Sequence, residues 1–385
     1  MNRPDTKTTL TPTLRFPEFS GEWEERKLGD LGSVKMCKRI FAHQTKEVGE
    51  VPFYKIGTLG SVADAFINKN LFKNYKLQYN FPRKGQTLIT CSGTIGKCVQ
   101  FDGRDSYYQD SNIVWIDNDN EVVDDDFLFL LLTNCRWDKL NSTTITRIYT
   151  NDLRSLKFEF PKSEEQRKIA SFLTSVDDWI ENLKKQKEAQ EKYKKGMMQK
   201  IFSQEIRFKD EDGSDYPEWE EKRFNEILVS TSPKYFQIKS SEIIATGEYK
   251  VVDQGKSLIA GYSNNSNKVF ESTPVIVFGD HTTILKYINF DFIIGADGTK
   301  ILMAKSNEDN LKFLFYLLQS NQIKPEGYKR HFSILSKMIF SKPTLSEQQK
   351  IADFLSSIDD LINITNQRIT QAEKWKKGVM QKMFI

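Results

Sequence analysis

A segment of 42 residues occurs twice in this chain, and this duplication limits the folds available to it. Shifting the sequence by 182 positions aligns residues 161–202 with residues 343–384 without a gap, and 21 of the 42 pairs are identical. The identical pairs gather near the two ends of the segment, around Lys168–Ala170 and around Lys194–Gly196. An internal repeat of this length predicts two related structural units.

Both copies have the apolar spacing of a long α-helix. Ser163 and Gln166 fit a capping box at the first helix start, and Ser346 and Gln349 fit one at the second. A helix of about 32 residues is about 48 Å long. Neither helix can bury its apolar stripe alone, so we expect the two to pack on each other. The stripe residues are Phe172, Val176, Trp179, Leu183, Tyr193, Met197, Phe354, Ile358, Leu361, Ala372, Trp375 and Val379.

Two short motifs lie inside the repeated segment. Gly196 and Gly378 each follow a Lys-Lys pair and predict the place where each helix weakens or ends. The acidic pairs Asp177–Asp178 and Asp359–Asp360 could suggest a metal. Adjacent helical residues point about 100° apart, however, so ion pairs or subunit contacts are the better interpretation.

The chain divides into four parts, because a length of 385 residues exceeds one ordinary core. The segment Leu14–Leu31, which contains Trp23, returns from Ile206 onward with a four-residue insertion, and each copy begins a half that ends in a long helix. We expect globular domains at 1–160 and 206–342, with helices at 161–205 and 343–385. Strands and helices together predict an α+β class. The expected strands and shorter helices are Thr87–Thr90, Lys97–Phe101, Asn112–Ile116, Asp125–Asn134, Val275–Phe278, Phe292–Ile294, Lys300–Met303 and Asn310–Ser320.

Composition excludes few functions, but it limits the expected cellular location and the expected metal content. The net charge of +4, from 56 basic and 52 acidic residues, is too small to indicate nucleic acid by itself. No apolar run approaches eighteen residues and the first 13 residues are polar, so we expect a cytoplasmic protein. The four cysteines form no CxxC pair and there are three histidines, so we expect no metal site.

The sequence contains no motif that predicts catalysis. Gly93–Lys97 is similar to a phosphate loop, but Cys91 stands where the first glycine belongs and Cys98 follows the lysine. A glycine-rich turn between strands is the better interpretation. Because nucleotide-cofactor and amino-methylation motifs are also missing from the sequence, we expect no catalytic residues.

The repeated residues resemble the conserved regions of the specificity subunit of type I restriction-modification enzymes. The shared text includes Glu165–Gln166, Lys168–Ala170, Asp177–Asp178 and Lys194–Gly196, and the order of the four parts matches that family's layout. The resemblance implies two β-rich recognition domains separated by an antiparallel coiled coil with a pseudo-twofold repeat. Each domain would read one half of a split, asymmetric DNA target, and the helices would set the spacing.

The resemblance also implies partners. Modification (methyltransferase) subunits, typically two, would dock near the repeated helices, and restriction subunits would join them. S-adenosylmethionine, ATP and Mg would bind to these partner subunits, with no cofactor in this chain.

The candidate DNA-binding residues lie on turns in the two globular regions. Base reading requires polar side chains on exposed loops, and phosphate contacts require basic or hydroxyl groups. These candidates are Thr94, Lys97, Tyr108, Gln109, Ser111, Arg147, Tyr149, Arg154, His281, Thr282, Thr283, Lys300, Lys329, Arg330 and His331.

Two other classes of function stay open at this point. A self-sufficient DNA methyltransferase or nuclease would act on DNA without partners, whereas a coiled-coil adaptor would link two protein ligands and bind no DNA. Methyl transfer by the purified chain would identify the first class, and a gel shift with duplex DNA separates the second.

Overall fold

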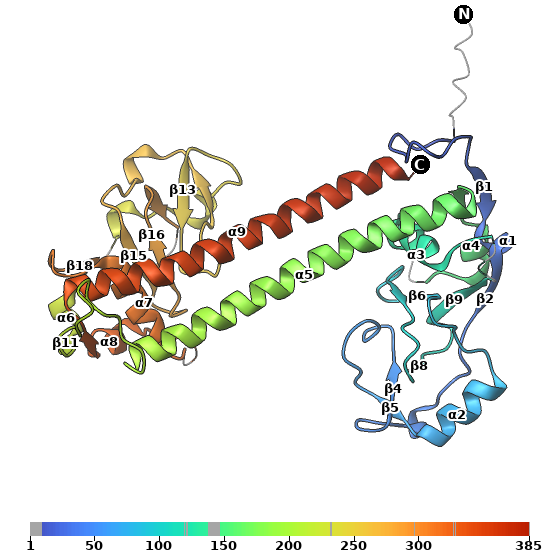
Figure 1. Ribbon diagram of the computed structural model, residues 1–385, viewed down its shortest axis with the longest axis horizontal. Helices are drawn as coiled ribbons and strands as arrows, with labels where there is room; N and C mark the ends of the chain where they lie inside the picture. Colours follow the sequence, from blue (N-terminus) through green and yellow to red (C-terminus); the bar gives the residue numbers. More distant parts are fainter. Residues whose placement is uncertain are drawn as a thin grey trace, which may run out of the picture. The chain divides into compact units, whose positions relative to one another are not determined.

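A computed structural model describes residues 10–118, 120, 122–137, 147–231, 233–295, 297–325, 327 and 329–384. Residues 1–9 of the polar start therefore lie outside the described part. The chain forms two compact units. The first comprises Met1–Asn182 with Thr370–Ile385, and the second comprises Leu183–Ile369. Two long helices, α5 (Ser163–Phe202) and α9 (Leu345–Met383), contribute one part to each unit (Figure 1).

The long helices are longer than the estimate of about 32 residues, although shorter than the ranges 161–205 and 343–385, and they continue through both glycines. They contain 40 and 39 residues. Gly196 and Gly378 lie inside them, and a Cβ atom built on either glycine meets nothing within 4 Å. The prediction that the helices end at these glycines is therefore wrong. Neighbouring residues supply enough helix hydrogen bonds to continue past a glycine, whose penalty is about 1 kcal/mol.

Within each unit the two helices pack on each other in opposite directions, as predicted. In the first unit Lys376 Nζ lies 2.5 Å from Asp177 Oδ1, and in the second Lys194 Nζ lies 2.6 Å from Asp359 Oδ1. These are equivalent positions of the repeat. Because the helices are antiparallel, the lysine near the end of each helix meets the aspartate near the start of the other helix, and this contact occurs once in each unit. The ion-pair interpretation of Asp177 and Asp359 is therefore confirmed.

Four residues of the predicted stripe lie outside the buried face. Trp179, Tyr193, Leu361 and Trp375 are 49%, 54%, 53% and 48% exposed. Their predicted burial is wrong because an apolar residue one position from the buried row still fits a three-and-four spacing. The buried row contains Leu173, Val176, Ile180, Leu183, Leu355, Ile358, Thr365, Ile369 and Ala372.

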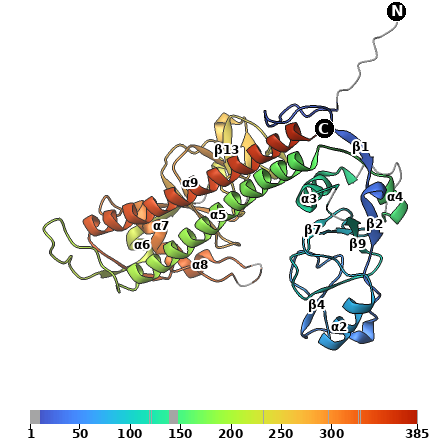
Figure 2. The same cartoon turned by 45° about the vertical axis from the view of Figure 1, so that its right-hand side comes forward.

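The first unit contains a two-stranded sheet, β1-β10, and two four-stranded sheets. One four-stranded sheet has the order β2-β9-β6-β7, and the other has the order β3-β5-β4-β8, in which β4 and β8 are parallel. Figure 2 shows α2 and α3 at opposite ends of this unit. The strands are β1 (Glu24–Lys27), β2 (Gly32–Lys35), β3 (Thr45–Lys46), β4 (Val51–Tyr54), β5 (Phe66–Ile67), β6 (Thr87–Thr90), β7 (Cys98–Gln100), β8 (Tyr107–Tyr108), β9 (Ile113–Asn118) and β10 (Lys157–Phe160). The helices are α1 (Leu28–Leu31), α2 (Lys69–Gln78), α3 (Asp125–Asn134) and α4 (Thr150–Ser155), with a 3-10 turn η1 (Ala42–Gln44).

The second unit has a similar arrangement, with a two-stranded sheet, β11-β19, and a second sheet that has one strand fewer than in the first unit. Its main sheet has the order β12-β18-β15-β16 and its second sheet the order β14-β13-β17, again with a parallel pair, β13 and β17. The strands are β11 (Glu220–Arg223), β12 (Leu228–Thr231), β13 (Tyr249–Val252), β14 (Gly261–Ser263), β15 (Val275–Gly279), β16 (Leu285–Ile288), β17 (Phe292–Ile294), β18 (Thr299–Ala304) and β19 (Ile339–Lys342). The helices are α6 (Phe224–Ile227), α7 (Leu311–Ser320) and α8 (Phe332–Leu335), with 3-10 turns η3 (Lys234–Phe236), η4 (Ser240–Glu242) and η5 (Ser266–Lys268).

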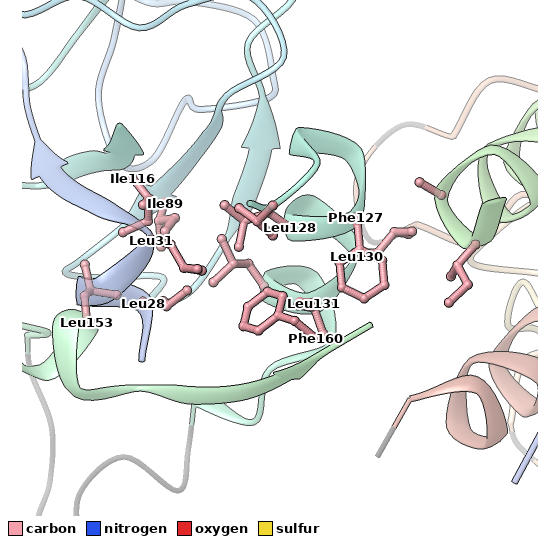
Figure 3. Packing of buried hydrophobic residues seen from close by; sticks show 14 of the residues in the cluster. Leu28, Leu31, Ile89, Ile116, Phe127, Leu128, Leu130, Leu131, Leu153 and Phe160 are labelled. Atoms are coloured by element: carbon pink, nitrogen blue, oxygen red, sulfur yellow. The ribbon is translucent and has the colours of Figure 1, made fainter. Parts of the chain in front are cut away.

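The main core of the first unit lies between α3 and the main sheet. Leu128 and Leu131 of α3 belong to one buried cluster with Ile89 of β6 and Ile116 of β9, and all four are labelled in Figure 3. The helix begins where it does because the Asp124 carboxylate accepts hydrogen bonds from Asp126 N and Phe127 N. Asn310 caps α7 in the same way through Phe313 N.

A repeated glutamine joins each long helix to the globular body. Gln166 Oε1 accepts a hydrogen bond from Asp124 N at 2.9 Å, and Gln348 Oε1 accepts one from Asn310 N at 2.9 Å. These glutamines thus bond to the residues that cap α3 and α7. The predicted capping box of Ser163 with Gln166 is therefore wrong. The box of Ser346 with Gln349 is wrong as well, because Gln349 Oε1 accepts from the Asn310 side chain at 2.6 Å.

A repeated glutamate beside that glutamine is buried and paired. Glu165 is 2% exposed, and Arg15 donates to it through Nε at 2.7 Å and Nη2 at 2.6 Å. Glu347 is 0% exposed and accepts from Arg207 Nη2 at 2.8 Å and Trp219 Nε1 at 3.2 Å. The hydrogen bond with Glu347 raises the pKa of Arg207.

The helix ends are also capped alike in the two units. In the second unit Ile206 N donates to Lys200 O at 3.1 Å, across the loop that follows α5. In the first unit Leu14 N donates to Lys382 O at 2.8 Å. Lys200 and Lys382 are equivalent in the repeat, so the segment at Leu14 meets the end of α9 as the segment at Ile206 meets the end of α5.

Replacing Arg207 by Ala should destabilise the second unit. The Glu347 carboxylate would remain buried without its guanidinium partner, which corresponds to a loss of about 3 kcal/mol. Urea unfolding followed by circular dichroism measures this loss. Lys222→Ala is the control, because half-buried Lys222 pairs with a well exposed carboxylate, Glu220, and losing this pair should leave the midpoint nearly unchanged. Equal midpoints for the two variants would contradict a structural role for the Arg207–Glu347 pair.

Candidate nucleic-acid interface

Each unit collects loops at the carboxyl ends of its two parallel strands. In the first unit Tyr54 of β4 pairs with Tyr108 of β8, and in the second Val252 of β13 pairs with Ile294 of β17. The chain leaves both strands of a parallel pair at the same edge, where ligands commonly bind. The loop that follows β6 or β15 reaches the same place, as the contacts below show.

In the first unit, hydrogen bonds join these loops into one cluster. Gln109 N donates to Tyr54 O at 2.9 Å, and Ile56 N donates to Gln109 Oε1 at 3.3 Å. Ser92 Oγ donates to Asn112 Oδ1 at 2.7 Å. We call residues 55–60, 91–97, 109–112 and 147–149 the first loop cluster.

Most first-domain candidates lie in this cluster. Arg147 Nη2 donates to Ser111 O at 2.9 Å, and its guanidinium carbon lies 5.9 Å from the ring centre of Tyr149, which is 64% exposed. Ser111 has a φ of 54°, which is unusual for a residue other than glycine. Thr94 is exposed and Lys97 half-buried on the turn between β6 and β7. This turn needs Gly96, whose φ is 77° and whose Cβ would lie 2.2 Å from Trp137.

Arg154 is separate from the other first-domain candidates. It is exposed on α4, and its side chain packs against Gly29 of α1. In the part of the chain that the structure describes, neither a hydrogen bond nor an ion pair joins the Arg154 side chain to the first loop cluster. Its DNA contact remains a prediction from sequence alone.

In the second unit, Gln254 joins three loops. Its backbone oxygen accepts from Thr282 Oγ1 at 2.7 Å, its Oε1 accepts from His281 N at 3.2 Å, and its Nε2 donates to Asp297 O at 3.0 Å. His281 Nδ1 lies 3.2 Å from Lys329 O, which brings a fourth segment into the group. We call residues 253–256, 280–284, 297–298 and 329–331 the second loop cluster.

A buried lysine supports this cluster from below. Lys286 of β16 is 5% exposed, and its Nζ donates to Asp253 O at 2.7 Å. Burial lowers the pKa of Lys286, while the nearby Asp253 carboxylate opposes that effect. The contact fixes the residue immediately before Gln254. Lys329 and Arg330 are exposed at the rim, and Lys300 is half-buried with its Nζ 5.3 Å from the Phe332 ring centre.

Three predicted DNA contacts are corrected by their burial. Tyr108, Thr283 and His331 are 4%, 2% and 1% exposed. The Tyr108 hydroxyl shares a 2.8 Å hydrogen bond with Ser106 Oγ, and His331 N donates to Asp280 O at 2.8 Å. These buried side chains stabilise the interior of the domains. Their positions beside turns looked exposed in the sequence because the partners that bury them are far along the chain.

The structure adds residues that the sequence did not single out. Gln254 and Asp297 in the second cluster, and Ser92 and Asn112 in the first, make the contacts between loops. A usable signal existed for Gln254, since an apolar run at Val251–Val252 followed by Gly255 marks a strand end and a turn.

Within the described ranges, His, Cys, Asp and Glu form no group of three suited to a metal ion. No helix in the part of the chain that the structure describes has the length and apolarity needed to cross a membrane.

Comparison with known proteins places this architecture in a family. The model of the type I restriction modification DNA specificity domain matches residues 20–191 and 216–374. The MjaVIII type I restriction enzyme specificity subunit of Methanocaldococcus jannaschii is 26% identical over 409 residues, covering 95% of this chain and 92% of that protein. A putative specificity subunit of Haemophilus influenzae, S.HindORF215P, is 47% identical over 151 residues, which is 39% of each chain.

Solved structures show the same fold. The crystal structure of the type I restriction-modification system S subunit from M. genitalium aligns with a TM-score of 0.64 at 19% identity, covering 97% of this chain and 99% of that one. A chain from a study of complex assembly and conformational transition of the type I R-M system aligns with a TM-score of 0.53 at 15% identity, covering 94% and 97%.

The chain therefore belongs to the type I restriction-modification DNA specificity family. It is a specificity subunit, which recognises DNA, and in such systems the catalytic activities lie on partner subunits.

Replacing Lys97 by Ala should reduce the salt dependence of DNA binding. A lysine that neutralises one phosphate contributes about one unit to the slope of log affinity against log salt. Titrating target duplex at several salt concentrations measures the slope. Tyr108→Phe is the control, because its buried hydroxyl should not meet DNA. A slope equal to that of the parent would remove Lys97 from the interface.

Proposed function

We propose that each loop cluster reads one half of a split, asymmetric DNA sequence. The observation that carries this proposal is one scaffold with two different loop sets. The first cluster offers Lys97, Arg147 and Tyr149, whereas the second offers His281 and Arg330 in loops at the same edge of an equivalent sheet pair. Because base identity is read by the pattern of donors and acceptors, different loop residues select different half-sequences.

The long helices have two tasks in this proposal. Each is continuous, and its length sets the number of unread base pairs between the two halves of the target. The helices also bind the subunits that carry out the chemistry, which are modification subunits using S-adenosylmethionine and restriction subunits using ATP and Mg. In this proposal the complex acts in the cytoplasm.

Exposed apolar side chains on the helices support two equivalent docking sites. Trp179 and Trp375 are half-exposed in the first unit, and Leu361 and Tyr193 are half-exposed in the second. Trp179 corresponds to Leu361 in the repeat, and Trp375 corresponds to Tyr193. Large apolar side chains exposed together commonly mark a partner interface. Because the repeat presents the same positions twice, two copies of one partner, the modification subunit, fit them.

The reading proposal predicts separate effects on the two halves of the target. In the complete complex, Lys329→Ala with Arg330→Ala should weaken DNA binding and relax base preference in one half only. The mirror variant, Tyr149→Ala with Arg147→Ala, should affect only the other half. Sequencing of methylated bases in cells expressing each complex reports the motif. Variants that alter the same half, or neither half, would contradict the assignment of one cluster to each half.

The docking proposal predicts a stepwise loss of modification subunits. Trp179→Ala with Trp375→Ala should remove one copy, because that change removes the exposed apolar side chains of both helices in the first unit. Tyr193→Ala with Leu361→Ala should remove the other copy. Native mass spectrometry counts the subunits. Lys374→Ala, on the exposed surface of α9 beside Trp375, is the control. Retention of both copies at parental affinity would exclude these patches as docking sites.

A further inference from the structure

The geometry of the second loop cluster points to Asp297 as a specificity-determining residue. We propose that its carboxylate accepts a hydrogen bond from the exocyclic amino group of one base, adenine N6 or cytosine N4, in the second half of the target. This inference rests on the proposed position of DNA at the second loop cluster.

Two glutamines hold Asp297 in place. Its Oδ1 accepts from Gln237 Nε2 at 2.8 Å, and its backbone oxygen accepts from Gln254 Nε2 at 3.0 Å. Gln237 is fixed in turn by a parallel bridge to Ile294 at the end of β17. Asp297 is nevertheless exposed. An exposed carboxylate is thus oriented by residues from two other segments, as base recognition requires.

An ordinary turn role does not account for this arrangement. An aspartate before a glycine commonly bonds to its own backbone two residues on, and Asp253 does so, with Gly255 N donating to its Oδ1 at 2.8 Å. The Asp297 side chain instead accepts a hydrogen bond from Gln237, 60 positions earlier. The backbone turn is made by Gly298, whose φ is 74° and whose Cβ would lie 2.7 Å from the His281 ring.

The charge of Asp297 explains why a base amino group suits it. Its glutamine partners are neutral and therefore do not balance the charge of a carboxylate. Beside DNA phosphates this charge is unfavourable unless a donor compensates it. In the major groove the base donors are the amino groups of adenine and cytosine, whereas guanine O6 and thymine O4 are acceptors. Asp297 would therefore accept one kind of base edge and repel the other.

The first unit contains a matched aspartate in a different electrostatic state. Asp110 lies in the equivalent loop after β8, and its Oδ2 accepts from Arg39 Nε at 2.9 Å. The Asp110 side chain is 17% exposed, and the guanidinium balances its charge. Asp110 therefore serves the structure of the first cluster, which makes it the control for Asp297.

The test uses Asp297→Asn and Asp110→Asn in complete complexes with modification subunits. Dissociation constants are measured for target duplexes carrying each base pair at every position of both halves. Asparagine keeps the shape of the side chain but removes its charge and adds donors. For Asp297→Asn, discrimination at one position of the second half should fall about tenfold, and binding to unrelated duplex should tighten. Asp110→Asn, in the first loop cluster, should leave every preference in the second half unchanged. The base preferred by the parent at the relaxed position identifies adenine or cytosine.

Gln237→Ala separates positioning from folding. It should relax the same position more weakly, because Asp297 loses an orienting bond but keeps its charge. Unchanged preferences in Asp297→Asn would overturn the inference. If the Lys329 and Arg330 variants still relax the second half, this inference alone fails. If those variants also bind and discriminate like the parent, the position of DNA at the second loop cluster fails with it.

Discussion

The buried glutamate at the start of each long helix is the interaction on which the rest of the structure depends. Glu165 and Glu347 are almost completely buried, and a buried carboxylate is tolerated only with a partner. The partners Arg15 and Arg207 come from segments about 150 and 140 residues earlier. Each pair therefore joins the first residues of a globular region to the helix that follows it. The neighbouring glutamines, Gln166 and Gln348, add the capped helices α3 and α7 to the same junction.

This junction explains where the chain retains its repeat. The identical residues concentrate at the ends of the helical segment, where they bond to the globular bodies or to the opposite helix. Lys194 meets Asp359 in one unit, and Lys376 meets Asp177 in the other, so a change in either copy disturbs an ion pair made by both copies. Residues in the middle of the segment do not form equivalent ion pairs in both units, and there the two copies differ in sequence.

Local patterns in the sequence predicted the elements well but predicted partners poorly. The predicted strand Thr87–Thr90 and helix Asp125–Asn134 match β6 and α3, because strand propensity and capping act within a few residues. The prediction that Trp179 lies on the packed face of its helix was wrong, since a row of residues shifted by one position has almost the same apolar spacing. The role of Gln166 was wrong because its partner, Asp124, is 42 positions away. Tyr108 was misassigned for a similar reason, since β4 buries it from outside its own segment.

The same division of constraints explains how the two domains can differ. The contacts that build each scaffold lie in the sheets, the α3 or α7 core and the helix junction, away from the strand ends. The loop clusters need only to be joined to one another, and different residues achieve this in the two units. In the first unit Gln109, which follows β8, hydrogen-bonds to the loop after β4. In the second unit Gln254, which follows β13, hydrogen-bonds to the loop after β17. A carboxylate lies near each of these contacts, balanced by Arg39 in one unit and held by the neutral Gln237 in the other. Because the scaffold does not depend on which of these contacts joins the loops, loop chemistry can change while the helices stay the same.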